Sequence, residues 1–158
     1  MRAAYGIQPL VDAGINGAGR TIVIIDAYGS PTLAADVASF NNVWGLPPTN
    51  LTVLAPFGVA STSPANADGW SGETTLDVEW APAIAPAAKI VLLVARSNDD
   101  ADILDLTQYM VDHSNGDVLY TRFGAASAVM QPAQLTPQQP PLTAATHKGP
   151  QAIHSTAP

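Results

Sequence analysis

Four short runs of apolar residues stand out along the chain. They are Thr21–Asp26, Leu51–Pro56, Lys89–Ala95 and Asp117–Phe123. The first and third are continuous and contain many β-branched residues, which is typical of strands buried on both faces of a parallel sheet. We therefore predict a strand at each of the four runs.

Two segments between these runs have the period of a helix. Pro31 is well placed to begin one that reaches about Trp44, where Gly45 and two later prolines end it. The segment Asp99–Ser114 is the second, and its apolar face is formed by Ile103, Leu106, Tyr109, Met110 and His113.

The middle of the chain combines a predicted loop with a third helix. Residues Phe57–Gly72 are rich in glycine, serine, alanine and proline, so we expect a loop there. A helix follows from Gly72, and Pro82 should kink it or end it just past Asp77, because proline lacks the N–H that the helix needs.

Strands that alternate with helices predict an α/β protein with a mainly parallel sheet between two helical layers, a three-layer αβα arrangement. We expect one domain over residues 1–126. Residues 127–158 are rich in proline and glutamine and contain few large apolar side chains, so we expect this segment to be poorly ordered.

Composition excludes several classes of function. The 158 residues include six basic and 13 acidic ones, for a net charge of −7, so neither nucleic acid nor an anionic membrane surface is an expected partner. The chain has no cysteine, which excludes disulfides and cysteine-based zinc sites. We find no apolar run long enough to cross a membrane and no signal-peptide pattern at the start.

Three groups of residues have simple structural explanations. The glycine-rich segment Gly14–Arg20 precedes a strand, whereas a phosphate-binding loop follows one, so we expect a surface turn. The acids between Asp99 and Asp105 crowd a helix start, where they favour the helix dipole more simply than they would bind calcium. No histidine has a partner at metal-binding spacing, so we predict no metal site from His113, His147 and His154.

Glu73 and Asp77 are the candidate site. On a helix, residues four apart share a face, where like charges repel. Leu76 and Trp80 make the neighbouring surface apolar. Burial raises the pKa of a carboxyl group and repulsion separates the two values, so such a pair can share one proton and serve acid–base chemistry at acidic pH. The alternative is a solvated helix face that carries two acids.

Several stretches resemble one peptidase family in sequence. They are AAYGI (Ala3–Ile7), GAGRTIVIIDAYGSP (Gly17–Pro31) and GETTLDVEWAPAIAPAAKIVLLVA (Gly72–Ala95). Together they resemble the catalytic domain of the sedolisins, or serine-carboxyl peptidases, which are acid-active endopeptidases and tripeptidyl peptidases with a subtilisin-like fold. The likeness extends in order from Ala3 to Gly124.

The resemblance implies catalytic roles for three acids. The family uses a Ser–Glu–Asp triad whose two acids lie in an E-x-x-L-D pattern, here Glu73 and Asp77. It implies that Glu73 takes the proton of a serine hydroxyl, that Asp77 orients Glu73, and that Asp26 is a supporting acid. We expect Glu73 and Asp77 to face the C-terminal end of the first strand, close to Asp26, because sites in parallel sheets gather at that edge.

The resemblance also implies a substrate-binding edge and shows where this chain departs from the family. Arg122, Phe123 and Gly124 match the strand edge that pairs with the substrate, but arginine replaces the usual serine and could obstruct the cleft. The segment Lys148–Pro158 resembles the approach to the oxyanion aspartate, and an ungapped match would place Pro158 at that aspartate.

Other parts of the family pattern have no counterpart in the sequence. These are the nucleophilic serine motif and the C-terminal calcium site, so we expect no cofactor in this chain. The resemblance thus implies a truncated, N-terminal part of a subtilisin-like peptidase domain that is inactive alone. Its substrate, if the domain were completed, would be a peptide or protein, and its location would be extracellular.

Two alternatives come from other classes of function. One is a non-catalytic α/β binding or interaction module that keeps the fold and has lost the chemistry. The other is a glycoside hydrolase, which also uses two acids. Acids on adjacent turns of one helix do not flank a sugar bond from opposite sides, so this second alternative has little support.

Overall fold

The fold is a parallel sheet between two layers of helices. The computed structural model describes residues 1–61, 64–113, 116–121 and 151–154. Neighbouring strands all run parallel, in the order β2-β3-β1-β4-β5. The strands that the structure describes are β1 (Thr21–Ala27), β2 (Asn50–Leu54), β3 (Lys89–Ala95), β4 (Val118–Thr121) and β5 (Gln151–His154).

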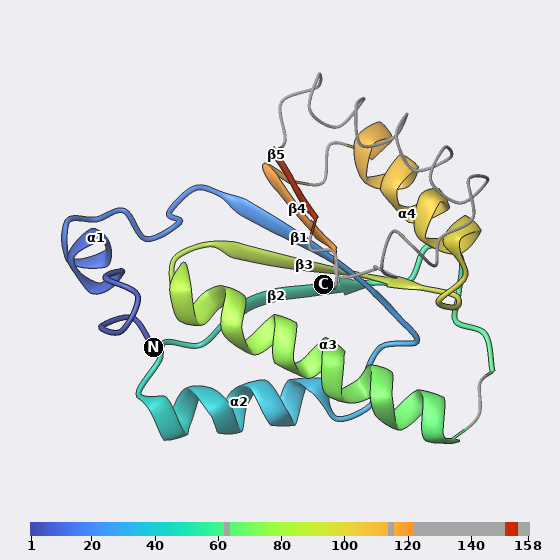
Figure 1. Ribbon diagram of the computed structural model, residues 1–158, viewed down its shortest axis with the longest axis horizontal. Helices are drawn as coiled ribbons and strands as arrows, with labels where there is room; N and C mark the ends of the chain where they lie inside the picture. The colour runs from blue at the N-terminus through green and yellow to red at the C-terminus, as the bar shows by residue number, and fades with distance from the viewer. Residues whose placement is uncertain (62–63, 114–115, 122–150, 155–158) are drawn as a thin grey trace, which may run out of the picture.

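Helices lie on both faces of this sheet. α2 and α3 lie side by side on one face, and α4 covers the other (Figure 1). This arrangement confirms the α/β prediction. In the described ranges, no helix combines the length and apolar character that a membrane crossing needs. The helices are α1 (Gln8–Asp12), α2 (Leu33–Trp44), α3 (Pro64–Ile84) and α4 (Asp100–His113).

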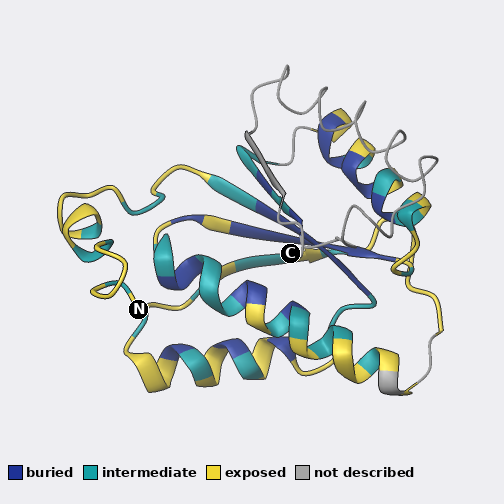
Figure 2. Cartoon of the chain, in the orientation of Figure 1, coloured by how far each residue is buried: buried dark blue, intermediate teal, exposed yellow. Residues whose placement is uncertain are grey.

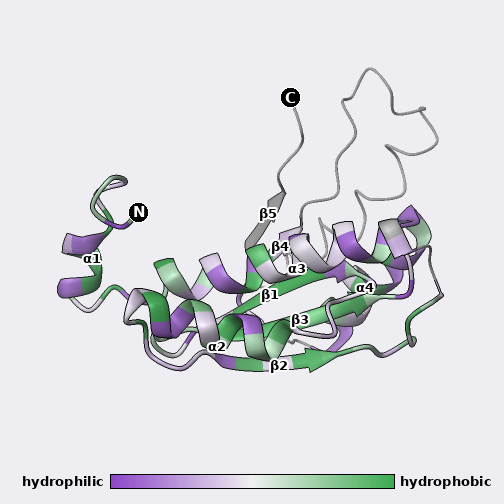
Figure 3. Cartoon of the chain, turned by 90° about the horizontal axis from the view of Figure 1, so that it is seen from below, coloured by the Kyte–Doolittle hydropathy of each residue, from purple (hydrophilic) through white to green (hydrophobic). Residues whose placement is uncertain are grey.

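Successive residues of β1 contribute to two different apolar cores. Val23 and Ile25 pack in the core that contains Met110 of α4, whereas Ile24 packs in the core that contains Val78 of α3. This alternation follows from the two-residue period of a strand. The central strands are almost wholly buried (Figure 2) and mostly apolar (Figure 3), which explains why they were visible in the sequence as continuous apolar runs.

α3 begins earlier than the sequence pattern predicts. It starts at Pro64, so the prediction of a loop over Phe57–Gly72 is wrong for the second half of that segment. Proline is tolerated at the first turn of a helix. The ring of Trp70 contacts that of Tyr28, which directly follows β1. Such tertiary packing stabilises helices whose residues have poor intrinsic helix propensity.

α3 also continues through Pro82, which is buried. The prediction that the helix ends just past Asp77 is therefore wrong. Pro82 lies in the last turn, so the only helical bond it removes is the one to the carbonyl of Val78. The N–H of Ala85 still donates to the carbonyl of Ala81, at 2.9 Å.

The glycine-rich segment before β1 is a turn, as predicted. Gly17 has a φ of 86°, and a Cβ atom built there would lie 2.9 Å from that of Ala88 and 3.0 Å from that of Ala85. Backbone conformation and space both require glycine at this position. The turn therefore packs directly against the connection between α3 and β3.

The chain ends contain two elements that the sequence pattern did not predict. One is the short helix α1, and the other is β5, which pairs with β4. β5 lies within the segment 127–158 that was expected to be poorly ordered, and the remainder of that segment lies outside the described residues. β4 is described to Thr121, so the predicted continuation to Phe123 also lies outside them.

Candidate functional site

Three acids occupy protected positions in the layer between the sheet and α3. Asp26 has no exposed surface and Asp77 has 7%, whereas Glu73 is half-buried. Both carboxylate oxygens of Asp26 are buried, as are Oε1 of Glu73 and Oδ2 of Asp77. Acidic side chains are rarely this buried in proteins, so these residues are candidates for a functional site.

Asp26 faces α3 because of its position in β1. It lies two residues after Ile24, so it shares the sheet face on which Ile24 packs with Val78. Asp26 is also level with Val94 of β3, another member of that core. The strand period therefore places Asp26 in the same layer as the buried face of α3.

Asp77 belongs to the stripe of α3 that faces the sheet. Thr74, Asp77 and Val78 are buried, at the spacing of one helix face. The apolar neighbours named from the sequence do not explain this burial, since Leu76 is exposed and Trp80 packs against α2. The sheet itself shields Asp77 from water.

Tyr120 of β4 reaches Asp77 from the neighbouring strand. Its hydroxyl donates a hydrogen bond to Oδ1 of Asp77 at 3.5 Å. Tyr120 is level with Ile24 of β1 in the sheet, and it packs against the same core as Val78. The structure therefore brings together side chains from β4 and α3 that are 43 residues apart in sequence.

The helix turn before Glu73 is fixed to the loop that follows β1. The rings of Trp70 and Tyr28 lie 6.4 Å apart, and Oγ of Ser71 donates to Oγ of Ser30 at 2.7 Å. Tyr28 has a φ of 58°, a left-handed conformation that non-glycine residues rarely adopt. The first half of α3 thus lies at the C-terminal end of β1, the edge at which parallel sheets bind ligands.

Glu73 lies between the buried layer and a surface cavity. This cavity has a volume of about 330 Å³ and is lined by Asn66, Gly69, Trp70 and Glu73. A carboxyl group with one buried oxygen and access to a cavity can exchange a proton with a molecule bound there. The sequence pattern identified Glu73 but missed Trp70, which it assigned to a loop.

The other residues singled out from the sequence either have a structural role or lie outside the described residues. Asp102 accepts hydrogen bonds from Ser97 and Arg96, and the Ser97 bond is the main cause of its lowered pKa. His113 ends α4 and bonds through Nδ1 to the carbonyl oxygen of Tyr109. The described part of the chain contains no group of three metal-binding side chains. Residues outside the described ranges include His147, Arg122, Phe123 and Gly124.

The fold and the three acids define an α/β protein with a parallel sheet and acidic side chains beside the C-terminal end of its central strand. No protein-family model matches the chain, and no curated protein sequence matches it. The chain is similar in structure to a Pseudomonas sedolisin (serine-carboxyl proteinase) complexed with two molecules of pseudo-iodotyrostatin. The TM-score is 0.73 at 19% identity, over 90% of this chain and 40% of that one.

A second solved structure is similar across nearly the whole chain. It is the PatG macrocyclase domain, with a TM-score of 0.56 at 10% identity, over 94% of this chain and 54% of that one. The chain therefore spans about half or less of each of these two proteins. Identities this low establish the fold alone, and that fold is subtilisin-like.

Proposed function

We propose that this chain supplies the acidic part of a serine-carboxyl peptidase site. In this site Glu73 is the general base, Asp77 orients it, and Asp26 supports Asp77 from the sheet. The observation that carries the proposal is the burial of Asp26 and Asp77 in one layer, with Glu73 one turn away beside a cavity. The structural likeness to sedolisin supports it.

The proposed reaction is peptide hydrolysis at acidic pH. Glu73 accepts the proton of a serine hydroxyl as the hydroxyl oxygen attacks the peptide carbonyl carbon, and later returns a proton to the leaving amine. A carboxylate serves as both base and acid in an acidic medium, where an imidazole would stay protonated. The nucleophilic serine and the oxyanion aspartate of the sedolisin pattern have no counterpart in this sequence, so the chain alone is proposed to be inactive.

The proposed site can be tested by measuring the electrostatic coupling between Glu73 and Asp77. Carboxyl NMR would follow the titration of Asp77 in the wild-type chain and in Glu73→Gln. Removing a neighbouring negative charge should move the Asp77 titration to lower pH, by about one unit or more for a coupled pair. Glu79→Gln is the matched control, since Glu79 lies on the same helix and should leave Asp77 unchanged. An Asp77 titration curve that is the same in the wild-type chain and in Glu73→Gln would refute the proposed pair.

The nucleotide sequence that flanks this coding region would distinguish a peptidase from the non-catalytic alternative. A peptidase requires a serine in a Gly-Thr-Ser-like setting within the downstream coding sequence, in the same frame or a shifted one. An intact gene without such a serine would instead support a binding module that has kept the subtilisin-like fold.

A further inference from the structure

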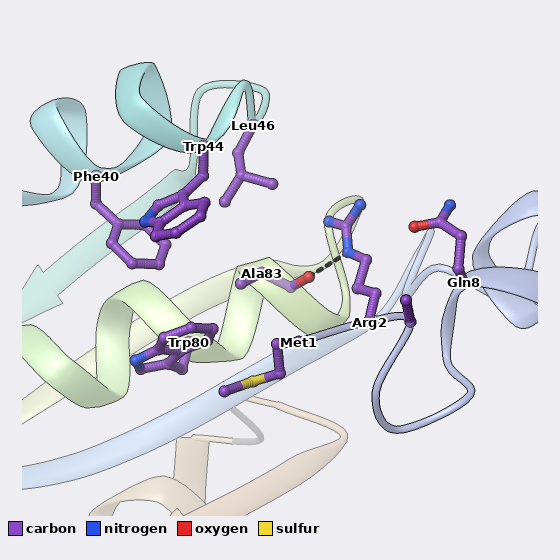
Figure 4. Close-up of a pocket in the computed structure, with 9 residues that line it drawn as sticks. Met1, Arg2, Gln8, Phe40, Trp44, Leu46, Trp80 and Ala83 are labelled. Atoms are coloured by element: carbon purple, nitrogen blue, oxygen red, sulfur yellow. Dashed lines mark hydrogen bonds between the residues drawn. The ribbon is translucent and has the colours of Figure 1, made fainter.

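A second cavity lies at the opposite end of α3 from Trp70 and is unrelated to the proposed peptidase site. It has a volume of about 330 Å³ and lies where α2 and α3 meet the first residues of the chain (Figure 4). Volumes of this order are sufficient for a small organic ligand. Its lining includes three aromatic side chains and one arginine, but no acidic side chain.

The aromatic side chains form one wall of this cavity. Phe40 of α2 contacts Trp80 of α3 edge to face, with ring centroids 5.3 Å apart, and contacts Trp44 at 6.3 Å. Trp44 nevertheless remains 64% exposed, although a ring of this size is usually well buried. The two indole rings therefore offer apolar surface that a flat, apolar group could cover.

Arg2 supplies positive charge at the edge of the same cavity. Its Nε donates to the carbonyl oxygen of Ala83 in the last turn of α3, which stabilises the end of that helix. Its Nη2 is buried and has no hydrogen-bond acceptor in the described structure. A buried donor without an acceptor is unfavourable, so a shift of the guanidinium toward an anion in the cavity would give Nη2 the acceptor that the protein does not supply.

The geometry points to a binding site for a small aromatic carboxylate. The ring of the ligand packs against Trp44 and Trp80, and its carboxylate accepts hydrogen bonds from Arg2. Acids on the neighbouring elements do not line the cavity: Asp12 accepts a hydrogen bond from the Gln8 amide at 2.7 Å, and Asp36 and Glu79 repel each other across α2 and α3. The proposed peptidase chemistry does not use this site.

Three compounds that share an indole ring test the inference. Indole-3-acetate, indole-3-acetamide and tryptamine carry charges of about −1, 0 and +1 near neutral pH. We expect the acetate to bind roughly tenfold more tightly than the amide, and tryptamine to bind most weakly. The net charge of −7 would by itself favour the cation, so non-specific attraction predicts the reverse order.

The three tryptophans of the chain report where the compounds bind. In ¹⁵N NMR spectra, the indole N–H signals of Trp44 and Trp80 should shift and saturate with indole-3-acetate. The signal of Trp70 should stay unchanged, because Trp70 lies at the other end of α3 against Tyr28. Equal shifts at all three tryptophans, or no saturable shift at Trp44 and Trp80, would overturn the inference.

Variants separate the charge from the ring surface. Arg2→Gln retains an N–H group for the Ala83 carbonyl but loses the charge, so it should abolish the preference for the acetate over the amide. Arg2→Lys should retain that preference even if it weakens the end of the helix. Arg20→Gln is the control arginine, since Arg20 pairs with Asp117 on the surface and should have no effect. If Arg2→Gln still prefers the acetate over the amide, the preference does not depend on Arg2 and the inference is wrong.

Discussion

Asp26 lies next to the last residue of an apolar strand and has a carboxyl group that water does not reach. A buried carboxylate is unfavourable unless neighbouring groups stabilise it, so proteins retain such residues where the chemistry needs them. The structure places Asp77 in the same layer and Tyr120 beside Asp77. At the scale of single residues, the candidate site thus includes a hydrogen-bond donor from the sheet, the Tyr120 hydroxyl, as well as the pair of acids on α3.

Replacing Tyr120 with phenylalanine should change the titration of Asp77 more than it changes folding. The Tyr120 hydroxyl favours the ionised form of Asp77, so its removal should move that titration to higher pH, by less than about one unit because the bond is long. The loss of unfolding free energy should stay near 1 kcal/mol or below. Carboxyl NMR and urea unfolding measure the two effects. Tyr109→Phe, on the opposite face of the sheet, should leave Asp77 unaffected.

Two glycines in the turn before β1 provide a matched pair of substitutions. Gly17 and Gly19 both have positive φ, but only a Cβ atom at Gly17 would collide with Ala85 and Ala88. Gly19→Ala should cost about 1–2 kcal/mol of unfolding free energy because of its conformation. Gly17→Ala should cost about 1–3 kcal/mol more, because it also overfills a packed contact. Equal losses in urea unfolding would contradict the close approach of this turn to the connection between α3 and β3.

At the scale of elements, α3 connects the candidate site with the aromatic cavity. Its first half lies over the loop after β1, its middle carries Glu73 and Asp77, and its last turn lies beside Arg2. Glu79 lies on its other side, toward α2. The pKa of Glu79 is raised, mainly by burial and then by the negative charge of Asp36.

Glu79→Gln should therefore stabilise the chain in a pH-dependent way. The folded state holds the Glu79 proton more tightly than the unfolded state does, so stability is lost as the pH rises from the ordinary value of 4.5 through the raised one. Glutamine removes that loss. The variant should be more stable than the wild type at pH 7, by less than about 1 kcal/mol, and the gain should disappear at pH below the ordinary value. Urea unfolding at both pH values checks this, and an equal gain at both would be inconsistent with it.

Sequence patterns predicted the elements that are buried on both faces and missed those held by distant contacts. β1 and β3 were visible because continuous apolar runs leave little alternative to a central strand. The start of α3 was not visible, since its glycine, serine, asparagine and aspartate residues have low helix propensity and its position depends on the packing of Trp70 against Tyr28. The spacing of Glu73 and Asp77 indicated a shared helix face. The contribution of Tyr120 follows from strand register, which the local pattern does not contain.

At the scale of the whole molecule, the chain alone should not hydrolyse peptides. Members of a catalytic triad act as a unit, so the acids of the proposed site should retain almost none of the rate without the nucleophilic serine. The purified chain and Glu73→Gln would be compared on a denatured protein substrate from about pH 3 to about pH 7, around the usual pKa values of carboxyl groups. We expect no cleavage by either. Cleavage by the wild type that Glu73→Gln abolishes would reveal a nucleophile within this chain.

The strand order also determines when the sheet can form during synthesis. β1 lies at the centre, yet both of its neighbours, β3 and β4, come much later in the chain. At typical translation rates, the apolar residues of β1 emerge from the ribosome seconds before Lys89–Ala95 can pair with them. Contacts between residues so distant in sequence also form slowly. The nascent chain thus exposes an apolar strand that has no partner yet, and a chaperone would bind it during this interval.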